Sequence, residues 1–159
     1  PAVRRPTAED RAAMLRAAHL SGKAIDIAMT TAPHAISYAI THDFGVPHGQ
    51  AVALTLGPAL VFNASASEAD LVDPRGLDHL RTSIDLILSK LGCHDVREGS
   101  ERLVMLMEAI GCKTRLSQLQ IEGNEVLSRI ASSVNLERLR NNPRRMNGEQ
   151  LMGLLESIQ

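Results

Sequence analysis

The sequence predicts an all-α domain, a bundle of about seven helices, because its apolar residues recur at helical spacing in successive segments. No segment has the period-2 alternation of a half-buried strand. Aromatic residues are only 2% of the 159 residues, so the core must consist of Leu, Ile, Val, Met and Ala. That composition suits packed helices better than a sheet, which favours aromatic and β-branched residues. We expect one domain over residues 1–159, with no sheet of three or more strands.

The first two helices are indicated by their starts. Thr7-Ala-Glu-Asp10 has the form of a capping box, and a run of small apolar residues follows from Arg11 to Ala28. We expect this first helix to pack tightly inside the domain. Pro33 can occupy the first turn of a second helix, which runs to about Phe44.

Residues 44–47, Phe-Gly-Val-Pro, form a predicted turn, since Gly and Pro together permit and enforce a reversal. A third helix is expected from His48 to Asn63, with a kink at Pro58. Residues 68–76 read as a polar loop. Later helical runs cover residues 77–91, 103–110, 126–134 and 151–158. Gly92 ends the first of these runs and Gly111 ends the second.

Several functional classes are not favoured by the composition. The 17 Lys and Arg nearly balance the 18 Asp and Glu, and the pairs Arg4-Arg5 and Arg144-Arg145 are too short to form a basic patch. We therefore expect no nucleic-acid partner. We also expect no membrane span, because no apolar run approaches the roughly 20 residues required. Neither a glycine-rich phosphate loop nor a strand to precede one is present, so this chain holds no dinucleotide-binding domain.

The cysteines and the first residue concern the origin of the chain. Cys93 and Cys112 lack CxxC spacing and no signal peptide opens the chain, which favours two reduced, buried thiols in a cytoplasmic protein. Pro1 in place of Met indicates a processed end or the cut edge of a longer polypeptide.

The stretch from Ala32 to Gly49 contains three of the six histidines. His34 and His48 each lie near the start of a predicted helix. Antiparallel helices joined by a short turn place the start of one opposite the end of the other, so the two imidazoles can converge only if the first helix is short or steeply angled. Neutral imidazole is a good ligand for Fe, Zn, Ni and Cu. The residues alone leave open whether these histidines share a metal or lie apart at the surface.

The same stretch resembles the signature of the iron-containing (group III) alcohol dehydrogenases. His34-Ala35 matches the first part of that signature, and Pro47-His48-Gly49 matches its end, fourteen residues after the first His. Outside the signature, Gly22-Lys-Ala24, the apolar segment from Ala51 to the Phe-Asn at 62–63, and Asn142-Pro-Arg144 are also similar to the family. The resemblance covers nearly the whole chain and implies the family's helical, metal-binding C-terminal domain.

The resemblance implies that His34 and His48 are two of four ligands to Fe²⁺ or Zn²⁺. The other two, from an Asp-x-x-x-His helix, would lie about thirty residues before Pro1, and the family's N-terminal dinucleotide-binding domain is also absent from this chain. The complete enzyme would transfer a hydride between NAD(H) or NADP(H) and a small aldehyde or alcohol, with the metal polarising the substrate oxygen. This chain alone would be inactive.

One position departs from the family pattern: Tyr38 stands where the family commonly has a second His. Four residues after His34, it shares that residue's helix face, and it is either a catalytic phenol or a packing residue. The sequence His-Ala-Ile-Ser-Tyr at residues 34–38 is similar to the corresponding stretch of family members that reduce phosphonoacetaldehyde. His42, beside Asp43, is expected to face solvent or to act as a charge at the helix end. We interpret His19, His79 and His94 as structural.

Two other hypotheses remain. The chain could be a stand-alone helical binding or assembly domain without catalytic activity, or part of a zinc-dependent homologue similar to glycerol dehydrogenase. The sequence leaves open the substrate, the choice between NADH and NADPH, and whether the protein is a homo-oligomer.

Overall fold

A computed structural model describes Val3 and residues 5–159. Pro1, and Arg4 of the first arginine pair, lie outside the described residues. The chain divides into two compact units, residues 1–30 and residues 31–159. Across the described residues, no helix has both the length and the apolar content to cross a membrane.

The first unit contains helix α1 (Ala8–Ala28), and its start agrees with the predicted capping box. The Thr7 hydroxyl accepts from the Asp10 backbone N–H at 3.1 Å, and the Asp10 carboxylate accepts from the Thr7 N–H at 2.9 Å. Within this unit the expected tight packing is not found, because none of the helix's residues is buried. Ile27 is 83% exposed. A helix buries its apolar residues only against another element, and the described residues of this unit contain no second one.

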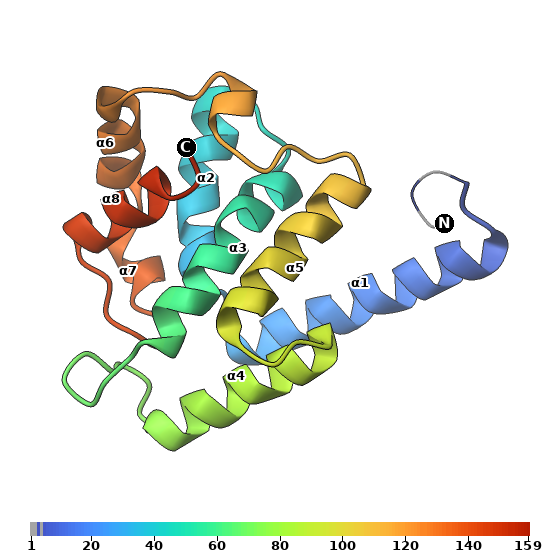
Figure 1. The fold of residues 1–159 in the computed structure, drawn as a ribbon, viewed down its shortest axis with the longest axis horizontal. Helices are drawn as coiled ribbons and strands as arrows, with labels where there is room; N and C mark the ends of the chain where they lie inside the picture. Colours follow the sequence, from blue (N-terminus) through green and yellow to red (C-terminus); the bar gives the residue numbers. More distant parts are fainter. Residues whose placement is uncertain (1–2, 4) are drawn as a thin grey trace. The chain divides into compact units, whose positions relative to one another are not determined.

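The second unit is entirely helical over its described length, which confirms the predicted fold class (Figure 1). The one β-type contact in residues 31–159 is an isolated bridge between Leu71 and Arg144. The helices of this unit are α2 (Ala32–Phe44), α3 (His48–Ala64), α4 (Leu77–Leu91), α5 (Val96–Ala109), a 3₁₀ turn (Ser117–Leu119), α6 (Asn124–Ser133), α7 (Leu136–Leu139) and α8 (Gly148–Glu156).

Helix ends follow local chemistry. Gly45 and Gly92 end α2 and α4 in the left-handed conformation that glycine adopts without strain. Helix α5 begins at Val96, seven residues before the apolar run that predicted it. The Asp95 carboxylate accepts from the backbone N–H groups of Arg97 and Glu98 and so starts the helix ahead of that run. Helix α7 is too short for its periodicity to be read from the sequence.

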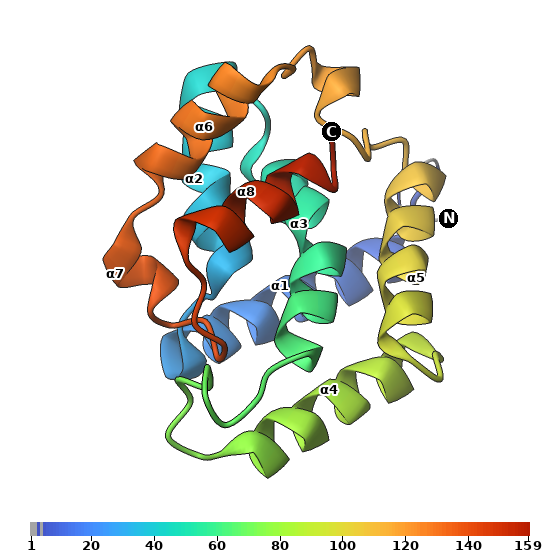
Figure 2. The same cartoon turned by 60° about the vertical axis from the view of Figure 1, so that its left-hand side comes forward.

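Helix α3 runs between α2 and α5 in both views (Figures 1 and 2). Glycines allow the α3–α5 approach: a Cβ on Gly57 would lie 2.5 Å from the Ser100 hydroxyl, and one on Gly99 would lie 3.1 Å from a Leu60 methyl. The main core is built, as predicted, from Ala, Leu, Ile, Val and Met. Its fully covered members include Ala32, Ile36, Ile40, Ala51, Leu116, Ile121, Leu127, Ile130 and Leu155.

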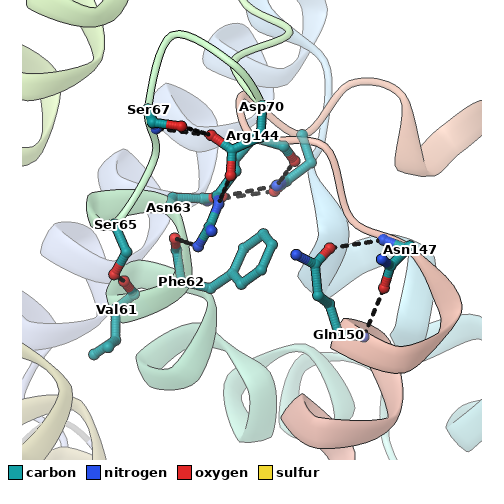
Figure 3. Close-up of polar contacts among 10 residues, drawn as sticks. Val61, Phe62, Asn63, Ser65, Ser67, Asp70, Arg144, Asn147 and Gln150 are labelled. Carbon is teal, nitrogen blue, oxygen red and sulfur yellow. Dashed lines mark hydrogen bonds and ion pairs between the residues drawn. The ribbon is translucent and has the colours of Figure 1, made fainter.

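The C-terminal end of α3 is held by a network of polar side chains (Figure 3). The amides of Asn63 and Asn142 bond to each other in both directions, at 2.7 and 3.3 Å. Arg144 donates to the Asp70 carboxylate at 2.6 Å and to the Phe62 carbonyl at 2.8 Å. The Phe-Asn and Asn-Pro-Arg segments, far apart in the sequence, therefore contact each other in the fold.

Candidate metal centre between α2 and α3

The structure brings His34 and His48 together, with their ring centroids 5.4 Å apart and their planes at 63°. Helix α2 is 13 residues long, so the convergence needs an explanation. The connection at residues 45–47 is not helical. Three non-helical residues can cover up to about 10 Å, the rise of six or seven helical residues. The chain therefore returns along α2 before α3 begins, and His48 lies beside residues 37 and 38 rather than beside the end of α2.

Ser37 orients the His48 ring. This serine is fully buried, and its hydroxyl donates to the His34 carbonyl at 2.8 Å, which leaves only its lone pairs for another partner. The Nδ1 atom of His48 lies 3.3 Å from the same oxygen, and with the hydroxyl proton directed to the His34 carbonyl this contact favours the tautomer that carries its proton on Nδ1. The Nε2 lone pair of His48 is then available to a metal, the usual arrangement around ligating histidines.

The surroundings of His34 favour the neutral form of its imidazole. The side chain is half-buried on the first turn of α2. Burial, and in second place the nearby His48, lower the pKa of His34 from its ordinary value of 6.5. The imidazole is consequently neutral at neutral pH, the form that binds metals.

The Tyr38 ring contacts His48 on α3 and the positively charged side chain of Arg138 on α7. Its ring centroid is 5.7 Å from that of His48, and the ring is 47% exposed. The guanidinium carbon of Arg138 lies 4.1 Å from the Tyr38 centroid, a cation–π contact. A pocket of about 280 Å³ opens beside them, lined by Ala35, Tyr38, Ser133, Asn135 and Arg138.

The donor set fits a late first-row metal. Two imidazoles bound to one ion at about 2.1 Å, with an angle near 100°, place their ring centroids about 5 Å apart. The measured 5.4 Å agrees with that arrangement. Among the described residues no third His, Cys, Asp or Glu joins the pair. His34 and His48 could therefore supply only part of a complete coordination shell.

Sequence reasoning missed Ser37 and Arg138. Ser37 could have been found, because a residue three positions after His34 shares its helix face. Arg138 gave no signal, since its place beside Tyr38 depends on how α7 packs.

The remaining histidines and the cysteines lie apart from the pair. The His42 side chain is 90% exposed and bonded to Asp43 at 2.8 Å, which confirms that it faces solvent. His19, His79 and His94 are exposed and are not core residues. Both cysteines are free, as expected, but only Cys93 is buried, while Cys112 is half-buried.

Comparisons with known proteins identify the family of this chain. Residues 2–159 match the family described as "Fe-containing alcohol dehydrogenase family, C-terminal". This chain belongs to the Fe-containing alcohol dehydrogenase family and corresponds to its C-terminal, all-α part.

Two proteins similar to this chain are an aldehyde reductase of known sequence and one of known structure. The chain is 38% identical over 150 residues to phosphonoacetaldehyde reductase of Streptomyces viridochromogenes. The aligned region covers 94% of this chain and 37% of that protein. It also resembles the crystal structure of sulfoacetaldehyde reductase from Bifidobacterium kashiwanohense in complex with NAD⁺. That match has a TM-score of 0.61 and 25% identity, and covers 81% of this chain and 31% of the other. The chain thus spans about a third of the length of each of these relatives.

Proposed function

We propose that residues 1–159 are the helical metal-binding domain of a longer enzyme that reduces a small aldehyde to an alcohol with NADH or NADPH. The observation that carries this proposal is the convergence of His34 and His48, beside Tyr38, in a member of this family. A preceding dinucleotide-binding domain and two further ligands would complete the site.

His34 and His48 would hold Fe²⁺ or Zn²⁺, which when bound supplies a Lewis acid for the substrate oxygen. Ser37 would hold the His48 ring through Nδ1 and so leave Nε2 free to bind the ion. The Tyr38 hydroxyl is a hydrogen-bond donor at the same end of α2. It would donate to the substrate oxygen as negative charge develops there during hydride transfer.

Phosphonoacetaldehyde is the substrate we propose, since a 38% identical relative carries that activity in its name. The sequence His-Ala-Ile-Ser-Tyr at residues 34–38 also resembles family members that reduce this aldehyde. The test is the oxidation of NADH and of NADPH by the full-length, metal-loaded enzyme in the presence of this aldehyde, together with elemental analysis. Metal bound at one equivalent and aldehyde-dependent oxidation are expected. A full-length protein that oxidises neither cofactor with any small aldehyde would contradict the proposal.

The purified 159-residue chain provides a second test. Without the dinucleotide-binding domain and two ligands, it should neither reduce aldehydes nor bind NAD(P)H. Turnover by the isolated chain would show that the proposed division of the active site is wrong.

A further inference from the structure

A positive side chain lies close to the candidate metal centre. The Tyr38 ring centroid lies 4.1 Å from the Arg138 guanidinium carbon and 5.7 Å from the centroid of the His48 ring. Because the two distances share the Tyr38 centroid, Arg138 cannot be more than about 10 Å from His48, within reach of one small bound molecule. Arg138 belongs to α7, and the packing of α7 against α2 brings it here.

The charge of Arg138 is free to meet a ligand. The ion pairs in the described part of the chain that involve arginine use Arg75, Arg81 and Arg144, and none includes Arg138. A cation–π contact uses the face of the guanidinium plane, whereas its five N–H donors point outward in that plane. The contact with Tyr38 therefore positions Arg138 without using up its hydrogen-bond donors.

Asn135 provides further donors at the same pocket. Its side-chain oxygen accepts from the backbone N–H groups of Glu137 and Arg138, at 2.9 and 3.1 Å, as the N-cap of α7. This cap fixes the amide orientation and leaves the two N–H donors of Nδ2. The lining residues of the pocket include no carboxylate. The pocket thus joins a cation and neutral donors, the surroundings that tetrahedral oxyanions require.

We propose that Arg138, assisted by the Asn135 amide, binds the anionic group of the substrate and selects aldehydes bearing a phosphonate or sulfonate over neutral aldehydes. The proposal rests on the aldehyde reductase function proposed above. In phosphonoacetaldehyde and sulfoacetaldehyde a single CH₂ separates the carbonyl from the anion. One such molecule can place its carbonyl at the Tyr38 hydroxyl and its anion at Arg138.

The kinetic test compares three substrates in the full-length metal-loaded enzyme: phosphonoacetaldehyde, sulfoacetaldehyde and the neutral propionaldehyde. Arg138→Gln should lower kcat/KM for the two anionic aldehydes about 10²-fold, since a charge-assisted contact is lost, and leave propionaldehyde within about threefold. A larger loss for phosphonoacetaldehyde than for sulfoacetaldehyde would identify phosphonate as the preferred anion, and the reverse would identify sulfonate.

Three further variants separate charge from structure. Arg138→Lys keeps the charge without the planar fork and should restore part of the lost activity. Asn135→Asp keeps the helix cap, places a negative charge at the pocket, and should disfavour only the anionic substrates. Arg140→Gln, at an exposed arginine two residues further on, should change nothing. An equal loss for anionic and neutral aldehydes in Arg138→Gln would show that Arg138 only supports Tyr38, and would overturn the proposal.

A binding measurement tests the anion site without turnover. In calorimetric titration with 2-hydroxyethylphosphonate, the Kd should rise about 10²-fold in Arg138→Gln, while the metal content stays that of the parent protein. Unchanged affinity in the variant would overturn the anion site. If the parent protein binds the phosphonate through Arg138 but reduces no aldehyde, the proposed function fails and the anion site stands.

Discussion

The two ends of α3 both carry polar side chains, but they differ in how completely those side chains are paired. At the C-terminal end, Asn142 is 1% exposed, and its side-chain nitrogen donates to Asn63 and to the Arg144 carbonyl. At the N-terminal end, His48 is exposed and its one polar contact to a described side chain is with Ser37, at 3.3 Å.

The unpaired groups gather near the start of α3. Thr41 Oγ1 and Gln50 Nε2, on the two helices that bear the histidines, are buried without a hydrogen-bond partner among the described residues. Arg138 likewise makes no ion pair there. Saturated networks give rigidity, whereas unsaturated donors and acceptors near a cleft are available to ligands. We therefore propose that α3 has a structural end, at Asn63, and a ligand-binding end, at His48.

The largest expected effect is at the ligand-binding end. His48→Asn or His34→Asn in the full-length enzyme should abolish retention of the metal and lower kcat/KM at least about 10³-fold, because Lewis-acid assistance contributes several kcal/mol. Elemental analysis and steady-state kinetics measure both effects. His42→Asn is the matched control on the same helix and should behave as the parent. Full metal content in both ligand variants would remove the metal assignment.

Tyr38→Phe should lower kcat/KM by about 10²–10³, the loss expected on removing one donor to a developing oxyanion. The phenyl ring keeps the surface that Arg138 and His48 contact, so the variant removes the hydroxyl alone. If the hydroxyl also relays a proton, one limb of the pH–rate profile should disappear. An unchanged rate and pH profile would mean that Tyr38 is a packing residue.

Ser37→Ala should weaken metal affinity about 10- to 100-fold, as changes to groups behind metal ligands do, since His48 loses the acceptor that holds its proton on Nδ1. Competition with a chelator measures the affinity. Ser37→Thr keeps the hydroxyl and tests whether the hydrogen bond is responsible. Equal metal affinity in the parent and Ser37→Ala would show that Ser37 does not orient the ring.

At the structural end, Asn142→Ala should reduce the free energy of unfolding by roughly 2 kcal/mol, because it leaves the Asn63 amide without its buried partner. Denaturant unfolding measures the change. Asn141→Ala, at the exposed neighbouring residue, is the control and should stay within about 0.5 kcal/mol of the parent. Below its lowered unfolding midpoint, Asn142→Ala should retain its metal. Loss of metal there would contradict the division between the two ends.

The smallest expected effect is on the stability of the fold at acidic pH, through Asp70. Hydrogen bonds from the Ser67 backbone N–H, from Arg144 and from the Ser67 hydroxyl lower the pKa of Asp70 from 3.8 to about 2. A depressed folded-state pKa means that this contribution to stability is complete above about pH 4 and is lost as the pH falls toward 2. Asp70→Asn should flatten the stability curve over that window, and Asp85→Asn, at an exposed residue of α4, should not. Identical acid profiles for the parent and Asp70→Asn would contradict this role.

Local sequence determined the fold class and most helix boundaries, because capping, periodicity and glycine termination act within a few residues. Pro33, Gly45 and Gly92 mark ends that the structure confirms. The start of α5 was also encoded locally, at Asp95, but reasoning from apolar residues alone overlooked it. The resemblance to a known family singled out His34, Tyr38 and His48, whose residue types and spacing would not have sufficed.

Only the tertiary structure decided which of these residues meet. The non-helical return at residues 45–47 puts His48 beside Ser37 and Tyr38, and α7 brings Arg138 to Tyr38 from a distant part of the sequence. The expected packing of α1 is not found within its unit for the same reason. An apolar pattern shows that a helix has a face to bury, but burial depends on which other element is available to cover that face.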